Sequence, residues 1–261
     1  MIKRCALALL RAVMGIGKMD AFLRPLHEPG QEERTFEVAQ EILELRVETE
    51  RRDRLEQVDL SRGCVMVANH PRGILDVFST GAWFSANTDL PVKCIGNRAI
   101  GRYVPALKPY VVGVNNMGVR GQERRAFNRE AFEEAKAFLS AGGILGVCPA
   151  GEVASLRLKS PEGWLRLTDH TWNPSFVRIA RELELPIVPI HISGRNRRIY
   201  YVLRFFGRIF GRLANFRELV ASKKQNVVIT VGQALTADEY AQLPDAEVAS
   251  RVRENLFGAL H

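Results

Sequence analysis

The sequence lacks the cysteine patterns of a metal site or a disulfide framework. Its four cysteines, at positions 5, 64, 94 and 148, form no CxxC pair and no Cys/His spacing that would hold zinc. At least three of them lie in apolar runs, as buried thiols do. We therefore expect reduced cysteines in the core of a cytoplasmic protein, and no metal.

A long hydrophobic run is also missing, because no apolar stretch approaches the roughly 20 residues that a spanning helix needs. The start resembles a signal peptide, but Arg11 interrupts its apolar stretch and no small-residue cleavage site follows. We expect this segment to be retained in the cytoplasm. Its apolar residues recur at helical spacing between basic ones. That pattern fits an amphipathic helix on a membrane or a helix packed on the domain.

Acidic side chains are absent from residues 194–217, which carry seven arginines. Residues 1–24 are also basic, and together the two segments exceed the whole net charge of +8. Such patches suit phosphate, nucleic acid or an anionic membrane. No helix-turn-helix, RRM or zinc-finger pattern is present, so we expect no nucleic-acid partner. Arginines 204, 208 and 212 recur beside aromatic residues, which fits a membrane-facing helix or a helix packed on the sheet.

What the sequence does contain is an alternation of strands and helices. Its 261 residues are 46% apolar, enough to bury a core without disulfides. The patterns predict an α/β fold with a largely parallel central sheet flanked by helices, and N-terminal amphipathic helices. We expect a helical, membrane-associating segment over 1–54 and an α/β domain over 55–261. Predicted strands cover 65–69, 91–95, 110–114, 143–148, 185–192 and 226–231. Predicted helices cover 31–54, 76–86, 97–108, 122–140, 173–183, 198–222 and 236–258, and 155–172 is predicted to be a polar connection.

The stretch from residue 65 to residue 76 holds the candidate catalytic pair. An apolar run predicts a buried strand, Pro71 and Gly73 predict a tight turn, and Asp76 is placed to cap the next helix. His70 ends the strand, one turn from that carboxylate. A carboxylate there fixes the imidazole tautomer and stabilises the imidazolium that forms when a proton is taken. The pair predicts a general base, His70, oriented by Asp76, although the same residues can also serve a turn structurally.

Other nucleophiles and histidines fit structural roles better. Ser79 and Thr80 fall within a predicted helix, where packing explains them. Ser155 lacks the Gly-x-Ser-x-Gly elbow of a serine hydrolase. Cys148 is predicted to fill the core, and His170 and His191 are predicted to be structural, with His191 a hydrogen-bonded core histidine.

Several blocks, in the correct order, resemble the glycerolipid acyltransferase family, which includes the 1-acyl-glycerol-3-phosphate acyltransferases. The family's first block has a His and an Asp separated by four residues, and five separate His70 from Asp76 here. That spacing, with Pro71 and Gly73, is similar to the hemolysin-like branch, which contains the ornithine-lipid O-acyltransferases. Nothing in the sequence reads as a pore. The resembling blocks are residues 69–76, 113–120 (loosely), 148–155 and 185–196, and the resemblance covers about residues 60–235.

The resemblance implies acyl transfer from a thioester, acyl-CoA or acyl-carrier protein, to the hydroxyl of a lysolipid, with no further cofactor. In the branch that makes phosphatidic acid, the third block carries a Glu and an Arg that hold the acceptor. Ala150 and Val153 stand at those positions here, and Glu152 replaces a Thr. Lyso-ornithine lipid and a lysophospholipid both stay open as acceptors. Glu152 is placed to pair with an ammonium group on the former.

The chemistry requires further groups around the base. Backbone N–H groups in the turn near Gly151 are candidates for meeting the oxyanion, and Arg120, Arg157 and Arg195 are candidates for holding phosphate. We expect the enzyme to lie peripherally on the anionic inner face of the cell membrane. The residues expected to contact substrate are Asn69, Arg72, Gly73, Arg120, Pro149, Ala150, Gly151, Glu152, Arg157 and Arg195.

Two rival functions fit the same fold. A thioesterase would share the base and use water as the acceptor. A non-catalytic lipid-binding protein would need neither catalytic residue, so the presence of both His70 and Asp76 argues against it.

Overall fold

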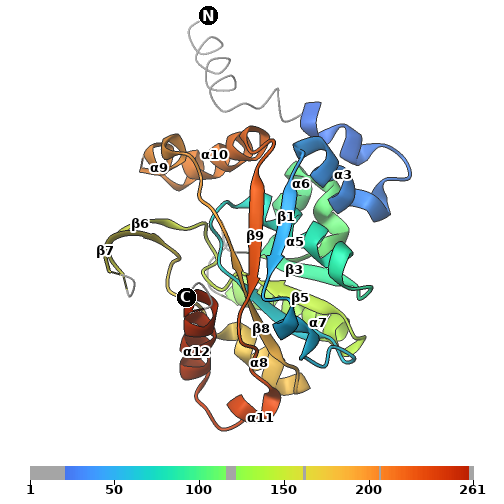
Figure 1. Cartoon of the computed structure of the whole chain (residues 1–261), viewed down its shortest axis with the longest axis vertical. Coiled ribbons are helices and arrows are strands. Elements are labelled where there is room, and N and C mark those ends of the chain that lie inside the picture. Colours follow the sequence, from blue (N-terminus) through green and yellow to red (C-terminus); the bar gives the residue numbers. More distant parts are fainter. Residues whose placement is uncertain (1–20, 116–121, 161–162, 206, 259–261) are drawn as a thin grey trace, which may run out of the picture.

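The structure is a computed structural model that describes residues 21–115, 122–160, 163–205 and 207–258. Within these residues, seven strands form a central sheet in the order β1-β9-β8-β2-β5-β3-β4 (Figure 1). Neighbouring strands are parallel except β8 and β9, which confirms the predicted α/β fold with a largely parallel sheet. The strands are β1 (Arg46–Glu50), β2 (Cys64–Ala68), β3 (Val92–Asn97), β4 (Val111–Val114), β5 (Ile144–Val147), β8 (Ile187–Ile192) and β9 (Asn226–Val231).

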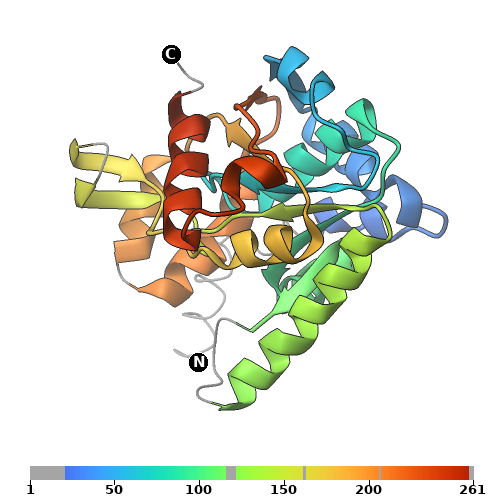
Figure 2. The same cartoon turned by 90° about the horizontal axis from the view of Figure 1, so that it is seen from below.

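Helices cover both faces of this sheet (Figures 1 and 2). One face packs against α3 (Thr35–Leu43) and α5 (Ile74–Asn87), and the other against α7 (Gln122–Ser140), α8 (Ser175–Leu183) and α12 (Asp245–Gly258). Two helices that follow β8, α9 (Arg198–Phe205) and α10 (Arg208–Ala221), lie at the opposite end of the molecule from α11 (Ala237–Tyr240) (Figure 1). The shorter helices are η1 (Pro25–His27), η2 (Glu32–Arg34), α4 (Asp53–Glu56), α6 (Ile100–Tyr103) and η3 (Pro105–Tyr110).

The central strand β2 shows why the sheet is buried on both sides. Val65 and Val67 pack into the cluster with α7, α8 and α12, whereas Met66 and Ala68 point to the face that carries α5. Successive strand residues face opposite sides, so a strand covered by helices on both faces is apolar at every position. Parallel strands β2, β3, β5 and β8 end at one edge of the sheet, where functional loops of such folds gather.

Two predicted elements are wrong. The predicted helix over 31–54 ends at Leu43, where Glu44 adopts a left-handed conformation, and β1 follows as an edge strand of the sheet. Its charged residues are exposed and alternate with half-buried Val47 and Thr49, so the period of the strand is two rather than helical. The predicted polar connection over 155–172 is instead a hairpin of β6 (Ser155–Ser160) and β7 (Gly163–Thr168). This hairpin projects from the body in both views (Figures 1 and 2).

Some sequence predictions fall outside the described residues. They include the amphipathic N-terminal helix over the first 20 positions and the proposed anion contact at Arg120. No helix within the described ranges has both the length and the apolar character needed to cross a membrane.

Candidate active site

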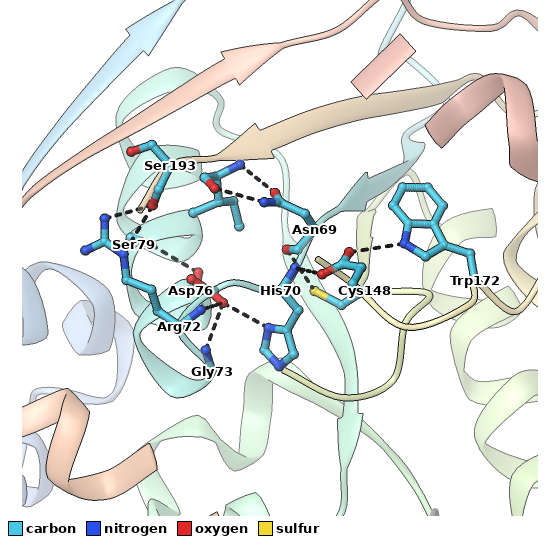
Figure 3. Close-up of polar contacts among 11 residues, drawn as sticks. Asn69, His70, Arg72, Gly73, Asp76, Ser79, Cys148, Trp172 and Ser193 are labelled. Atoms are coloured by element: carbon cyan, nitrogen blue, oxygen red, sulfur yellow. Dashed lines mark hydrogen bonds and ion pairs between the residues drawn. The ribbon is translucent and has the colours of Figure 1, made fainter. Parts of the chain in front are cut away.

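The site is built around a contact between His70, which follows β2, and Asp76 in the first turn of α5. The two side chains point toward one another, and 3.0 Å separates His70 Nδ1 from Asp76 Oδ2 (Figure 3). With Nδ1–H donating to the carboxylate, the lone pair of the imidazole lies on Nε2, which is the atom that a general base uses. The predicted contact is therefore present in the structure.

Asp76 is not the helix cap that the sequence predicted, because α5 begins at Ile74 and Gly73 precedes it. As the third helical residue, Asp76 turns back, and its Oδ2 accepts the backbone N–H groups of Arg72 and Gly73, both at 2.9 Å. Gly73 has a φ of +77°, which a side chain disfavours. A Cβ there would also stand 2.7 Å from Asn215 Oδ1. This glycine therefore allows the turn that carries five residues between His70 and Asp76.

Two residues predicted to bind substrate instead tie the His70 loop to its neighbours. The Asn69 side chain exchanges two hydrogen bonds with the backbone of Ile192, of 2.9 and 2.7 Å, and so joins the ends of β2 and β8. The Arg72 guanidinium donates to the Ser193 carbonyl and to Gln225 Oε1, away from His70 (Figure 3). Both residues are buried, so the structure gives them positioning roles.

The backbone of His70 is held by the third block and by a segment that sequence patterns did not single out. Its N–H donates to Asp169 Oδ1 at 3.2 Å, and its carbonyl accepts the N–H of Ala154 at 2.8 Å. Trp172 Nε1 in turn donates to Asp169 Oδ2 at 3.1 Å. Burial raises the pKa of Asp169, and these hydrogen bonds oppose that shift. Asp169 lies in the stretch predicted as a polar connection, where a lone aspartate gives no sequence signal of this role.

The ionisation of His70 is set by opposing influences. Burial, the largest of them, disfavours the charged imidazolium and lowers the pKa of His70. Interaction with the side chain of Cys148, together with the hydrogen bond and charge of Asp76, outweighs burial. The pKa of His70 is consequently well above its ordinary value.

A cavity of about 330 Å³ opens beside the pair, between α5 and the strands it covers. Most of its walls are apolar and come from α5, β2, β3 and β8, with contributions from α3, α6 and α10. Strand residues Gly96 and Gly146 face this space and keep it open, because they place no side chain there. His70, Gly73, Asp76, Gly151 and Glu152 line the same cavity. A base at one end of an apolar cavity suits a substrate that carries a hydrocarbon chain.

Comparisons with known proteins agree with this geometry. A sequence model of the acyltransferase family, described as "Acyltransferase", matches residues 46–193, more than half of the chain. The chain belongs to the acyltransferase family. It is also 22% identical over 206 residues to a protein named "Lyso-glycine lipid O-acyltransferase" from Phocaeicola vulgatus, with 77% of this chain and 68% of that protein covered. The resemblance that the sequence blocks indicated is thereby confirmed, and the protein is an acyltransferase enzyme.

In the structure, only part of the third block of this acyltransferase lines the cavity. Pro149 and Ala150 form the turn after β5 without lining the cavity, and the N–H of Gly151 donates to the Cys148 carbonyl at 2.9 Å. Because the Gly151 N–H already forms this hydrogen bond within the turn, a backbone donor to an oxyanion would have to come from a neighbouring residue. Glu152 Oε2 lies 2.7 Å from Nη2 of Arg204 on α9, a residue that sequence patterns placed on a membrane-facing stripe.

The remaining candidates lie apart from the cavity. Arg157 is half-buried on β6, and Arg195 is exposed in the loop after β8. Ser79 is buried and donates to the Asp76 carbonyl, as expected of a packed helix residue. His191 packs against Phe257, but its Nδ1 has no hydrogen-bond partner in the described chain, so the expected core hydrogen bond is wrong for this atom. Among the described residues, no group of three His, Cys, Asp or Glu side chains is arranged to hold a metal ion.

Proposed function

We propose that this acyltransferase moves a fatty acyl group from a thioester donor, acyl-CoA or acyl-carrier protein, to the hydroxyl of a lysolipid. The contact between His70 and Asp76 beside the apolar cavity carries the proposal. His70 Nε2 would take the hydroxyl proton while the oxygen attacks the thioester carbonyl, and the thiolate leaves. Asp76 would hold the imidazole in the reactive tautomer and stabilise the imidazolium.

The apolar lining of the cavity supports a hydrocarbon substrate, and the similarity to a lysolipid O-acyltransferase supports a lysolipid acceptor. The acyl chain would occupy the space over Gly96 and Gly146, with the thioester carbonyl near His70. We further propose that the enzyme works peripherally on the anionic inner face of the cell membrane, because both substrates present chains that prefer a bilayer.

The test is a radiolabelled acyl-transfer assay with a mixed lysolipid pool, both thioester donors, and wild type beside His70→Ala and Asp76→Ala. We expect wild type to make a new diacylated lipid, and loss of His70 to lower the rate by about 10²–10⁴. Release of free fatty acid without a lipid product would instead identify a thioesterase. Inert wild-type protein with both donors would favour the lipid-binding alternative.

A further inference from the structure

A buried carboxylate supports the backbone of His70 from the side opposite Asp76. In Figure 3, Asp76 lies on one side of His70 and Trp172 on the other. Asp169 is 4% exposed, and it accepts the His70 N–H at Oδ1 and the Trp172 Nε1–H at Oδ2, at 3.2 and 3.1 Å. Hydrogen bonds to an ionised acceptor are shorter and stronger than those between neutral groups. An ionised Asp169 therefore fixes the loop that carries the base.

A cation on α12 lies near that carboxylate. The guanidinium carbon of Arg253 is 5.5 Å from the centre of the Trp172 ring and 4.9 Å from that of Phe257. Its Nη2 donates to Oγ1 of Thr168, the residue before Asp169, at 3.3 Å. Burial, the largest influence, raises the pKa of Asp169, whereas its two hydrogen bonds and the charges of His70 and Arg253 lower it. Arg253 therefore favours the ionised form of Asp169, which burial opposes.

We call Asp169, Trp172 and Arg253 the Asp169 network, and it is separate from the substrate cavity. Among the described residues that line the cavity, none belongs to this network. Trp172 packs in the cluster with α7, α8 and α12, on the face of the sheet opposite α5. Helix α12 also lies beyond residues 46–193, which the acyltransferase model matches. These side chains can therefore affect the base without contacting the substrate.

The charges around His70 decide how the network acts on it. Asp169 is a second carboxylate whose charge interacts with that of His70, in addition to the carboxylate that contacts the imidazole directly. An opposite charge nearby favours the imidazolium, which is the form that His70 takes once it has accepted a proton. Among the described residues, the other groups that interact with His70 or bring charge to its cavity are Asp76, Cys148, Lys93, Glu152 and Arg204.

We propose that Asp169, Trp172 and Arg253 are positioning residues for the general base. Asp169 holds the His70 loop, and its charge stabilises the imidazolium that forms as the acceptor hydroxyl loses its proton. Trp172 orients the Asp169 carboxylate, and Arg253 keeps that carboxylate ionised. This inference rests on the proposed function, because it concerns the same base. It goes further by linking α12 to the rate of the reaction.

Steady-state acyl transfer over a range of pH tests the inference. Asp169→Asn keeps an oxygen that can accept the His70 N–H, and it removes the charge. We expect kcat to fall by about 10- to 100-fold with little change in KM, because a small displacement of a catalytic group is costly and the network does not contact the substrate. The rising limb of the pH profile should move to lower pH, because the imidazolium loses a stabilising charge.

The two other residues of the network allow graded variants. Trp172→Phe keeps an aromatic ring next to Arg253 and removes only the N–H donor, so kcat should fall less than in Asp169→Asn. Arg253→Gln should also lower kcat at an unchanged KM, and Arg253→Lys, which keeps the charge, should recover part of this loss. An unchanged kcat together with an unshifted pH profile in Asp169→Asn would overturn the inference.

The matched controls are a buried carboxylate and an arginine–aromatic contact elsewhere in the chain. Glu218, on α10, is 4% exposed, and its Oε2 accepts the backbone N–H of Arg197 at 2.8 Å. The guanidinium carbon of Arg178, on α8, lies 5.9 Å from the centre of the Phe132 ring. Glu218→Gln and Arg178→Gln should leave kcat and the pH profile unchanged. Thermal unfolding checks that each variant is folded.

Direct titration of His70 separates this inference from the proposed function. NMR of protein with isotope-labelled histidine follows the pKa of the imidazole without turnover, and His70→Gln identifies its signals. We expect a lower pKa of His70 in Asp169→Asn than in wild type, and no change in Glu218→Gln. If wild type acylates no acceptor, the proposed function fails while the titration still decides this inference. Equal pKa values of His70 in wild type and Asp169→Asn would overturn it whatever the activity.

Discussion

The rate of the reaction should follow the ionisation of His70, because a general base must be neutral to accept a proton. The pKa of His70 is raised, so we expect kcat/KM to rise with pH through a value above the ordinary pKa of about 6.5 and then level off. Asp76→Asn removes a carboxylate that raises this pKa. The rising limb should therefore move to lower pH while the plateau falls.

The pH profiles of wild type and Asp76→Asn measure this effect directly. The raised pKa also means that protonated His70 stabilises the folded state. This contribution is fully present below the unfolded pKa, about 6.5, and is lost as pH rises through the higher folded value. Identical limbs in the two proteins would contradict the assigned role of Asp76.

Arg72 should matter for folding more than for substrate binding. Its guanidinium is buried and hydrogen-bonds to Ser193 and Gln225, so Arg72→Met should lower the free energy of unfolding by about 1.5–3 kcal/mol. Arg251→Met, at an exposed ion pair, should change it by less than about 1 kcal/mol. Urea unfolding measures both. An increase in KM without a loss of stability would instead favour the substrate contact that the sequence predicted for Arg72.

For individual residues, the sequence predicts which side chains lie in the site more reliably than it predicts the role of each one. His70 and Asp76 lie close in the chain, so local spacing predicts their contact. Asp169 and Arg204 reach the site through tertiary packing, 99 residues from His70 and 52 residues from Glu152. No local pattern reports such pairings. From the sequence, an arginine beside the His70–Asp76 motif was expected to contact substrate. In the structure, the Arg72 guanidinium donates instead to Ser193 and Gln225.

At the scale of elements, the cavity depends on glycine in the strands that α5 covers. Gly146 on β5 lines the cavity, and a Cβ there would stand 3.6 Å from the Cβ of Cys94, an ordinary contact. Gly146→Leu should therefore fold and fill part of the cavity. We expect its activity to shift toward shorter acyl thioesters, and Gly146→Ala should show a smaller shift.

A series of donors that differ only in acyl length measures this change. Activity on the shortest donor serves as the internal control, because it reports that the His70 site is intact. The same chain-length profile in Gly146→Leu and wild type would show that the acyl chain does not lie over β5.

Helices and strands with a strong hydrophobic periodicity are predicted well from the sequence. Strands that form only because a distant strand pairs with them are not. The apolar stripe of α7 and the apolar run of β9 predict both elements with the bounds that the structure has. By contrast, β1 is a short charged strand that exists because β9 pairs with it, and β6 and β7 pair only with each other. Pairing of this kind lies outside the reach of local periodicity.

For the whole molecule, exposed apolar side chains gather on helices that also contribute to the cavity. Phe205 and Val202 on α9 are 88% and 52% exposed, and α9 also carries Arg204. A surface of this kind, in a segment rich in arginine, suits an anionic bilayer. Phe205→Glu should therefore weaken flotation with anionic vesicles. Gln242→Glu, which adds the same charge in the segment after α11, at the far end of the molecule, should not (Figure 1).

The basic N-terminal segment is the second expected membrane contact, and the structure sets where it can be cut. Phe22 and Leu23 are buried, and the ring of Phe22 lies 6.2 Å from that of Phe78 on α5. Removing residues 1–24 would therefore remove core residues and confuse unfolding with loss of binding. Removing residues 1–20 keeps this packing, and we expect it to weaken flotation while thermal stability is retained. Flotation equal to wild type in the truncated protein, together with a loss in Phe205→Glu, would assign the membrane contact to α9 alone.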